Sequence, residues 1–235
     1  MADLEFYVNF LNENMKLIVI LLGIGIVLIA MIIFFIIKSI KTKIKANRTE
    51  NMVQFAYKNG FNILDSINGE KLISKSNTLL RDTRKVTYSS IIQKSKDHIN
   101  YLIYDCKYFV GNKSPYIEFY QTVVQVKLEN KISNFFLNKK TLANSMIAKD
   151  LIKINEMFDK KYILVSTDRS IKSIFDESVV DYLIKTKVEM VIETSGGYIN
   201  FYNHHKLINS DKINNTLTQI KDILRLIDKK QIDTQ

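Results

Sequence analysis

The chain has little of several residue types that mark particular protein classes: its 235 residues include one cysteine, one proline, seven glycines and no tryptophan. A single thiol, Cys106, cannot form an internal disulfide, which argues against a bridge-stabilised secreted domain and points to a reducing compartment. The shortage of glycine and proline excludes collagen-like and linker-like material. Long disordered stretches are not expected, because 46% of the residues are hydrophobic.

Signatures of the common enzyme classes are also missing. The sequence contains no HExxH or CxxC pair for a metal, and no GxxxxGK[ST] or GxGxxG loop for a phosphate. Cys106 is interpreted as a small core residue rather than a nucleophile, because it alternates with apolar neighbours and has no placed histidine beside it. We therefore expect no enzyme activity, no metal and no cofactor.

Two further groups of residues carry side chains that could take part in chemistry. His204 and His205 are adjacent, and adjacent strand residues point to opposite faces, so a shared metal ion would need an irregular turn and more ligands. A solvated loop is the simpler interpretation. Glu189 and Glu193 lie on one strand face roughly 13 Å apart by strand rise, which is too far for a glycosidase-like pair.

The longest feature that is present is an apolar run near the N-terminus. Residues 17–37 form 21 consecutive positions without a charged or strongly polar side chain, close to the about 20 residues that a helix needs to cross a bilayer. A cleaved signal would have a shorter apolar region and a small-residue cleavage site, and a buried core helix would show a polar face. The run therefore predicts a transmembrane helix over residues 17–37.

Basic residues are concentrated on the C-terminal side of this run. Only Lys16 precedes it closely, whereas five basic residues follow it: Lys38, Lys41, Lys43, Lys45 and Arg48. The positive-inside rule then predicts a single-pass protein of the plasma (inner) membrane, with residues 1–16 outside and the C-terminal domain in the cytoplasm. The five residues are also candidates for contact with anionic lipid, which makes the lipid bilayer an expected partner, although a topology signal is the simpler interpretation.

The net charge of +10 is spread along the chain. No block alternates basic with aromatic residues, so a nucleic-acid partner is not expected.

The rest of the chain predicts one domain of the α+β class, built from antiparallel strands and hairpins with packed amphipathic helices. A basic juxtamembrane segment with a short helix is expected over residues 38–60, the cytoplasmic domain over 61–230 and a tail over 231–235. Strands are expected at residues 63–67, 85–93, 102–110, 116–128, 162–165 and 188–193, with a hairpin partner at 198–202. Helices are expected at about 140–155, about 168–183 and from 210, packed on the sheet, and a bulge is expected near Gln121.

Several segments of this domain, within about residues 100–228, form a recognisable set: YDCKY, QTVV, FDKKYILVSTDRSIKSIF, VEMVIETSGGYINFY and the terminal amphipathic helix. In these segments the chain resembles an uncharacterised family of bacterial single-pass membrane proteins. Its motif positions correspond here to Phe158, Tyr162, Leu164, Asp168, Lys172, Phe175, Glu193, Gly197 and Tyr202. The chain departs from the family at residues 165–167, where a glycine is common. The family carries no assigned activity, so the resemblance implies an N-terminal anchor and a cytoplasmic α+β domain but no mechanism.

These features together predict a membrane-anchored cytoplasmic interaction, scaffold or sensing domain with a protein partner of unknown identity. Two alternatives stay open: a module that binds a lipid surface through its basic face, and an enzyme that acts at the membrane. The enzyme alternative requires that His98, His204 or Asp105 gather in one deep pocket.

Overall fold

A computed structural model describes residues 2–65, 68–69, 72–73, 84–96, 99–110, 117–127, 132–141 and 149–232. The chain divides into two compact units, Met1–Glu50 and Asn51–Gln235. A long helix, α1 (Ala2–Asn59), forms the first unit and also supplies the first residues of the second.

The first unit does not support the predicted membrane span. Within the described part of the chain, no helix combines the length and the apolar character that a crossing requires. The predicted transmembrane helix over residues 17–37 is wrong by this finding, and the single-pass topology and plasma-membrane location that were deduced from it are corrected with it.

The five basic residues that were predicted to flank the span all lie in α1. Lys43 is exposed and Arg48 is half-buried, while the side chains of Lys38, Lys41 and Lys45 lie outside the described residues.

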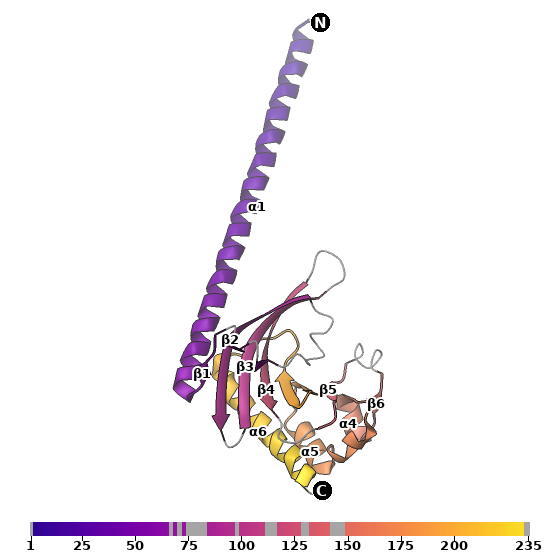
Figure 1. Cartoon of the computed structure of the whole chain (residues 1–235). Helices are drawn as coiled ribbons and strands as arrows, with labels where there is room; N and C mark the ends of the chain where they lie inside the picture. The colour runs from indigo at the N-terminus through magenta and orange to yellow at the C-terminus, as the bar shows by residue number, and fades with distance from the viewer. Residues whose placement is uncertain are drawn as a thin grey trace. The chain divides into compact units, whose positions relative to one another are not determined.

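The second unit is built on one antiparallel sheet (Figure 1), which in the described residues has nine strands in the order β1-β2-β3-β4-β9-β8-β5-β7-β6. The predicted fold class, with a transmembrane helix before its α+β domain, is therefore replaced by this large sheet with helices packed on it. The strands are β1 (Asn62–Ile63), β2 (Arg84–Lys96), β3 (Ile99–Val110), β4 (Ile117–Lys127), β5 (Phe136–Lys139), β6 (Leu151–Ile152), β7 (Tyr162–Val165), β8 (Val191–Ser195) and β9 (Tyr198–Tyr202).

The central strands are buried on both faces. All six residues from 121 to 126 of β4 are buried, and the β3–β4 register runs without a shift from Tyr101↔Val126 to Val110↔Ile117. The bulge predicted near Gln121 is therefore wrong. The prediction came from a change of apolar face along β4. Because both faces of this strand are buried, apolar side chains can lie on either face without a bulge.

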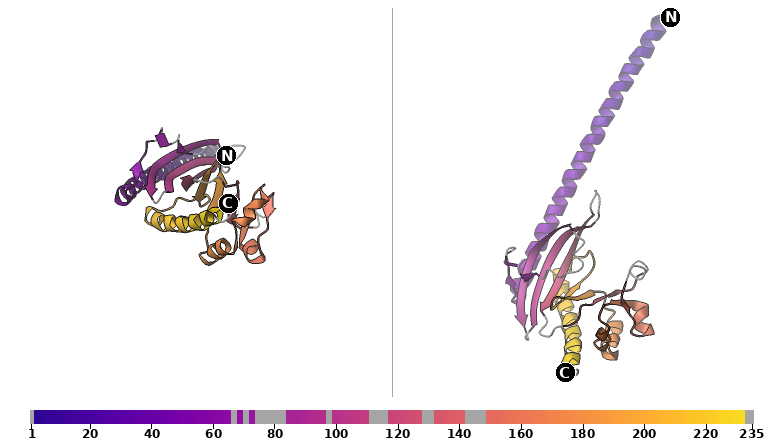
Figure 2. Two further views of the ribbon diagram at one scale, coloured as in Figure 1. Left: turned by 60° about the horizontal axis from the view of Figure 1, so that its bottom comes forward. Right: turned by 45° about the vertical axis from the view of Figure 1, so that its right-hand side comes forward.

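Helices cover one face of this sheet. The last helix, α6 (Ser210–Ile232), buries Ile213, Ile220, Leu224 and Ile227 in the main core, and Figure 2 shows it lying along the sheet. The predicted packing of this helix on the sheet is confirmed. The end of α1 joins the same core through Met52 and Phe55, among other residues.

Two predicted helices differ from the observed elements. In the described part of residues 140–155, β6 and an extended segment replace the helix, and Asp150 takes a positive φ of 56° that no helix interior accommodates. Residues 142–148 lie outside the described residues. The short helix α4 (Glu156–Lys161) begins only after Asn155, whose side chain caps it.

The helix predicted at about 168–183 is two elements. Asp168 caps the 3-10 helix η2 (Arg169–Ser173), and Asp176 caps the separate helix α5 (Glu177–Lys185) by accepting from the Val179 amide at 3.1 Å. A side-chain cap at Asp176 starts a new helix and so interrupts the apolar stripe that the sequence shows.

Candidate functional site

Five lysines surround one pocket in the second unit, here called the lysine pocket. Lys139 ends β5 and Lys140 follows it; Lys160 and Lys161 form the last turn of α4; Lys187 follows α5. The pocket has a volume of about 350 Å³ and is lined by these lysines with Tyr162, Ile184, Val188 and Glu189. Its lining therefore carries five cations and one carboxylate.

Strand pairing brings these lysines together. β5 pairs with β7 so that Lys139 lies opposite Tyr162, and α4 runs directly into β7. The Lys140 amide donates to the Lys161 carbonyl at 2.7 Å. Two lysine pairs that are about twenty residues apart in the chain are consequently neighbours in space.

Three of the five lysines have partners within the chain. Lys139 forms an ion pair with Glu189 at 2.9 Å, and Lys160 forms one with Glu156 at 2.6 Å. Lys140 donates to the Asp159 carbonyl at 2.8 Å. Among the residues that the structure describes, Lys161 and Lys187 make no ion pair, so their ammonium groups are available to an anion from outside the chain.

Lys187 occupies an unfavourable backbone conformation. Its φ is 50°, at the position after the end of α5 where the Val188 amide donates back to the Leu183 carbonyl at 3.2 Å. This is the helix ending in which glycine is the common residue. A lysine there costs about 1 kcal/mol of backbone strain, and strain of this kind is concentrated at functional positions.

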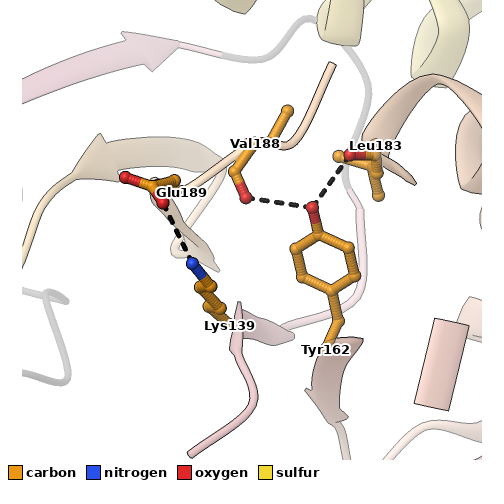
Figure 3. Close-up of polar contacts among 5 residues, drawn as sticks. All are labelled: Lys139, Tyr162, Leu183, Val188 and Glu189. Atoms are coloured by element: carbon orange, nitrogen blue, oxygen red, sulfur yellow. Dashed lines mark hydrogen bonds and ion pairs between the residues drawn. The ribbon is translucent and has the colours of Figure 1, made fainter. Parts of the chain in front are cut away.

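Tyr162 braces the turn that carries Lys187 (Figure 3). The Tyr162 hydroxyl donates to the Leu183 carbonyl oxygen at 2.8 Å and to the Val188 carbonyl oxygen at 3.0 Å. Burial raises the pKa of Tyr162, and the nearby Glu189 charge raises it further. The hydroxyl therefore stays protonated and acts as a donor that positions the turn.

Replacing Tyr162 with phenylalanine tests this brace. The variant keeps the ring in the core but leaves the two carbonyls without their buried donor, so the free energy of unfolding should fall by about 1–2 kcal/mol. Denaturant unfolding measures the change. Replacing Tyr198, which is half-buried in the β8–β9 hairpin, with phenylalanine is the control. An unfolding free energy of Tyr162→Phe equal to that of the wild type would contradict the brace.

The residues of the family resemblance are distributed over the domain rather than gathered in one site. Phe158, Leu164 and Phe175 are core residues. Asp168 caps η2, and Gly197 takes a φ of +83° in the β8–β9 turn. Lys172 is exposed. Tyr202 and Glu193 are buried together, and the Tyr202 hydroxyl donates to Glu193 at 2.9 Å. Tyr162 lines the lysine pocket.

The structure does not bring His204 and Asp105 together, the two described residues among those that the enzyme alternative requires. His204 and His205 lie in the turn after β9, where His205 Nδ1 is 2.8 Å from the Tyr108 hydroxyl. Asp105 lies on the other face of β3 and accepts from the Thr122 hydroxyl at 2.6 Å. His98 lies outside the described residues. Within the described ranges, no three His, Cys, Asp or Glu side chains form a group that could hold a metal ion.

The structure also places Cys106 and the two carboxylates, Glu189 and Glu193. Cys106 is fully buried, and burial raises the pKa of its thiol to about 12, which confirms it as a core residue with an unreactive protonated thiol. Glu189 is exposed at the lysine pocket, where the hydrogen bond and charge of Lys139 lower its pKa. Glu193 is 1% exposed in the sheet. The two carboxylates therefore do not act as a pair.

His204 predicts a dependence of stability on pH. Burial lowers its pKa, and the neighbouring His205 lowers it further. Below about pH 6.5 the unfolded chain then binds more protons than the folded chain, so stability falls as the pH drops. Denaturation midpoints at about pH 7 and about pH 5.5 should differ more in the wild type than in His204→Gln. An equal fall in both proteins would exclude His204 as the cause.

The lysine pocket is not predicted by the sequence. The available signal was the repetition of a Lys-Lys pair at residues 139–140 and 160–161, each beside an expected strand or helix boundary. Without the β5–β7 register, nothing places the two pairs next to each other or adds Lys187.

Comparison with known proteins adds information on the fold. No protein-family model matches the chain, and no curated protein sequence is significantly similar to it. Among solved structures, the crystal structure of the mycobacterial trehalose monomycolate transport factor A, TtfA, matches with a TM-score of 0.52 at 11% sequence identity. The match covers 77% of this chain and 96% of the TtfA chain. The protein is therefore similar to TtfA in fold.

Proposed function

We propose that the second unit is a non-catalytic interaction domain that binds an acidic segment of a partner protein through the lysine pocket. The observation that carries this proposal is a pocket of about 350 Å³ in which Lys161 and Lys187 make no ion pair within the described part of the chain. Of the other three lysines, Lys139 and Lys160 are paired with carboxylates, and Lys140 donates to a backbone carbonyl. A pocket of this volume is at the small end of ligand sites and suits one or two side chains.

Carboxylates are the expected ligands of this arrangement. Each lysine ammonium offers three donors, and a hydrogen bond between charged groups is stronger than one between neutral groups. Lys139 forms an ion pair with Glu189, and the negative charge of that carboxylate repels an anion at this side of the pocket. The acidic side chain of the partner would therefore bind between Lys161 and Lys187.

The comparison with TtfA is compatible with this proposal. That protein is a transport factor. At 11% identity the likeness concerns the fold alone, so the proposal depends on the lysine pocket.

Fluorescence anisotropy with a fluorescein-labelled hexaglutamate peptide tests the proposal. The full chain is used, in a mild non-ionic detergent because α1 exposes apolar side chains. Binding should weaken when sodium chloride is raised from about 50 mM to about 500 mM, because salt screens exposed charges. A hexaglutamine peptide is the uncharged control. Equal binding of the two peptides, or no binding of hexaglutamate, would overturn the proposed function.

Replacing Lys187 with glycine should change stability and binding in opposite directions. Glycine accepts the positive φ without strain, so the free energy of unfolding should rise by about 0.5–1 kcal/mol. The loss of one charge-assisted hydrogen bond should weaken hexaglutamate binding by about tenfold. Denaturant unfolding and anisotropy measure the two effects. Lys187→Arg keeps both the charge and the strain and is the control; a Lys187→Gly variant that binds like wild type would remove Lys187 from the site.

A further inference from the structure

A second pocket, here called the α6 pocket, is lined by two lysines and by no described carboxylate. It has a volume of about 340 Å³ and is formed by α6, the end of α1 and the neighbouring strands β2 and β3. Its lining residues are Asn59, Phe61, Lys94, Tyr101, Asn214, Leu217, Thr218 and Lys221. None of them belongs to the lysine pocket, so the two pockets are separate.

Strand pairing and the end of α1 place Lys94 in the α6 pocket. Lys94 of β2 lies directly opposite Tyr101 of β3, so the two side chains are on the same face of the sheet. The Lys94 ammonium donates to the carbonyl of Asn59, the last residue of α1. It also lies 5.3 Å from the centre of the Phe61 ring. Contacts on two sides therefore fix the position of this charge.

Within the described part of the chain, no carboxylate balances the charge of Lys94. Lys94 makes no ion pair there, and the Asn59 carbonyl accepts from only one of the three donors of its ammonium. The Lys94 side chain is half-buried, and salt screens a partly buried charge pair much less than an exposed one. Lys221 of α6 lines the same pocket and adds positive potential. A negative charge is therefore stabilised in this pocket.

The rest of the lining offers apolar contact. Phe61 and Tyr101 belong to the main core, and Leu217 of α6 packs against it; all three also line the α6 pocket. Asn214 of α6 donates through Nδ2 to Asn59 Oδ1 at 3.1 Å, which connects α6 to the end of α1 beside the pocket. A volume of about 340 Å³ is at the small end of ligand sites. The pocket therefore suits a small molecule with one charged end and one apolar end.

We propose that the α6 pocket binds a small organic anion that carries one carboxylate on an apolar ring or short chain. The carboxylate accepts from the Lys94 ammonium, and the apolar part lies against Phe61, Tyr101 and Leu217. A neutral ligand would gain nothing from the charge of Lys94, and a wholly polar anion would gain nothing from the apolar lining. This inference does not depend on the proposed function of the lysine pocket.

Three probes test both parts of this proposal: benzoate carries the charge and the ring, benzamide the ring alone, and acetate the charge alone. Saturation-transfer NMR with the full chain in a mild non-ionic detergent measures binding, and a sample of detergent without protein corrects for probe that enters the micelles. Benzoate should bind in the millimolar range expected of so small a ligand, and the other two at least about tenfold more weakly. No binding of benzoate, or equal binding of benzoate and either other probe, would overturn the proposal.

Single lysine variants show whether benzoate binds in the α6 pocket. Lys94→Gln removes the charge, so benzoate binding should fall at least about tenfold. Lys212→Gln is the control, because Lys212 is an exposed lysine of α6 that does not line the pocket; its binding should stay within about twofold of wild type. Lys94 also contacts the end of α1, so if Lys94→Gln does not fold, Lys221→Gln should weaken binding at least about threefold.

Two results with these variants would contradict the assignment. The first is an equal loss of benzoate binding in Lys94→Gln and Lys212→Gln, which would mean that benzoate responds to net charge alone. The second is undiminished binding in the folded Lys94→Gln variant, or in Lys221→Gln where Lys94→Gln does not fold.

Discussion

Replacing Phe158 with alanine is expected to lower the free energy of unfolding by about 3–5 kcal/mol, because the deletion of a fully buried aromatic ring leaves a cavity. Phe158 is fully buried, and its ring centroid lies 5.4 Å from that of Tyr162 and 6.0 Å from that of Phe175. The three rings join the segment before α5 to α4 and β7, and these two elements carry Lys160, Lys161 and Tyr162 of the lysine pocket. Denaturant unfolding followed by tyrosine near-ultraviolet circular dichroism measures the loss, since the chain has no tryptophan.

The neighbouring residue provides the control for this experiment. Met157 is in the same helix turn but is 61% exposed, so Met157→Ala should change stability by no more than about 0.5 kcal/mol. If both variants lost the same amount, the effect would come from helix α4 itself and not from the aromatic cluster.

Reversing the charge of both Lys161 and Lys187 should reduce hexaglutamate binding at least about a hundredfold. Each lysine contributes about 1.5–3 kcal/mol through a charge-assisted hydrogen bond, and the introduced glutamates add repulsion. Stability should change little by comparison, because both side chains are exposed. Anisotropy titrations of Lys161→Glu/Lys187→Glu measure the loss.

A second double variant separates the pocket from the general charge of the protein. Lys172 and Lys212 are exposed lysines on η2 and α6, outside the lysine pocket. Lys172→Glu/Lys212→Glu changes the net charge by the same amount and should retain binding within about twofold. Equal losses in the two double variants would mean that the peptide responds to net charge alone, and the lysine pocket would no longer explain binding.

The elements predicted correctly depend on neighbours in the sequence. The turn of the β8–β9 hairpin follows from Ser195-Gly196-Gly197, and both glycines take positive φ values. Its first strand is Val191–Ser195 and not residues 188–193, the range that the alternation predicts. The start of α6 at Ser210 and its packed face follow from apolar residues spaced by three and four. Gly60, with a φ of +66°, ends α1 as the sequence indicates.

The features that could not be predicted depend on contacts between distant residues. The pairing of β4 with β9 joins Val123 to Tyr202 and leaves no signature in either strand alone. The lysine pocket depends on the pairing of Lys139 with Tyr162. The apolar periodicity also predicts one helix where there are two elements. The reason is Asp176, whose side chain caps a new helix by accepting from a backbone amide.

The position of β9 in the sheet determines when the chain can fold during synthesis. β9 is the ninth strand in sequence but lies in the middle of the sheet, between β4 and β8. Until residues 198–202 have left the ribosome, β4 has no neighbour on that side, and the sheet exists only as separate halves with open edges. Such long-range pairing slows folding to milliseconds or seconds, and unpaired edges invite association between chains. A nascent chain that stops before β9 is therefore expected to aggregate, and the complete sheet should form only after β9 has left the ribosome.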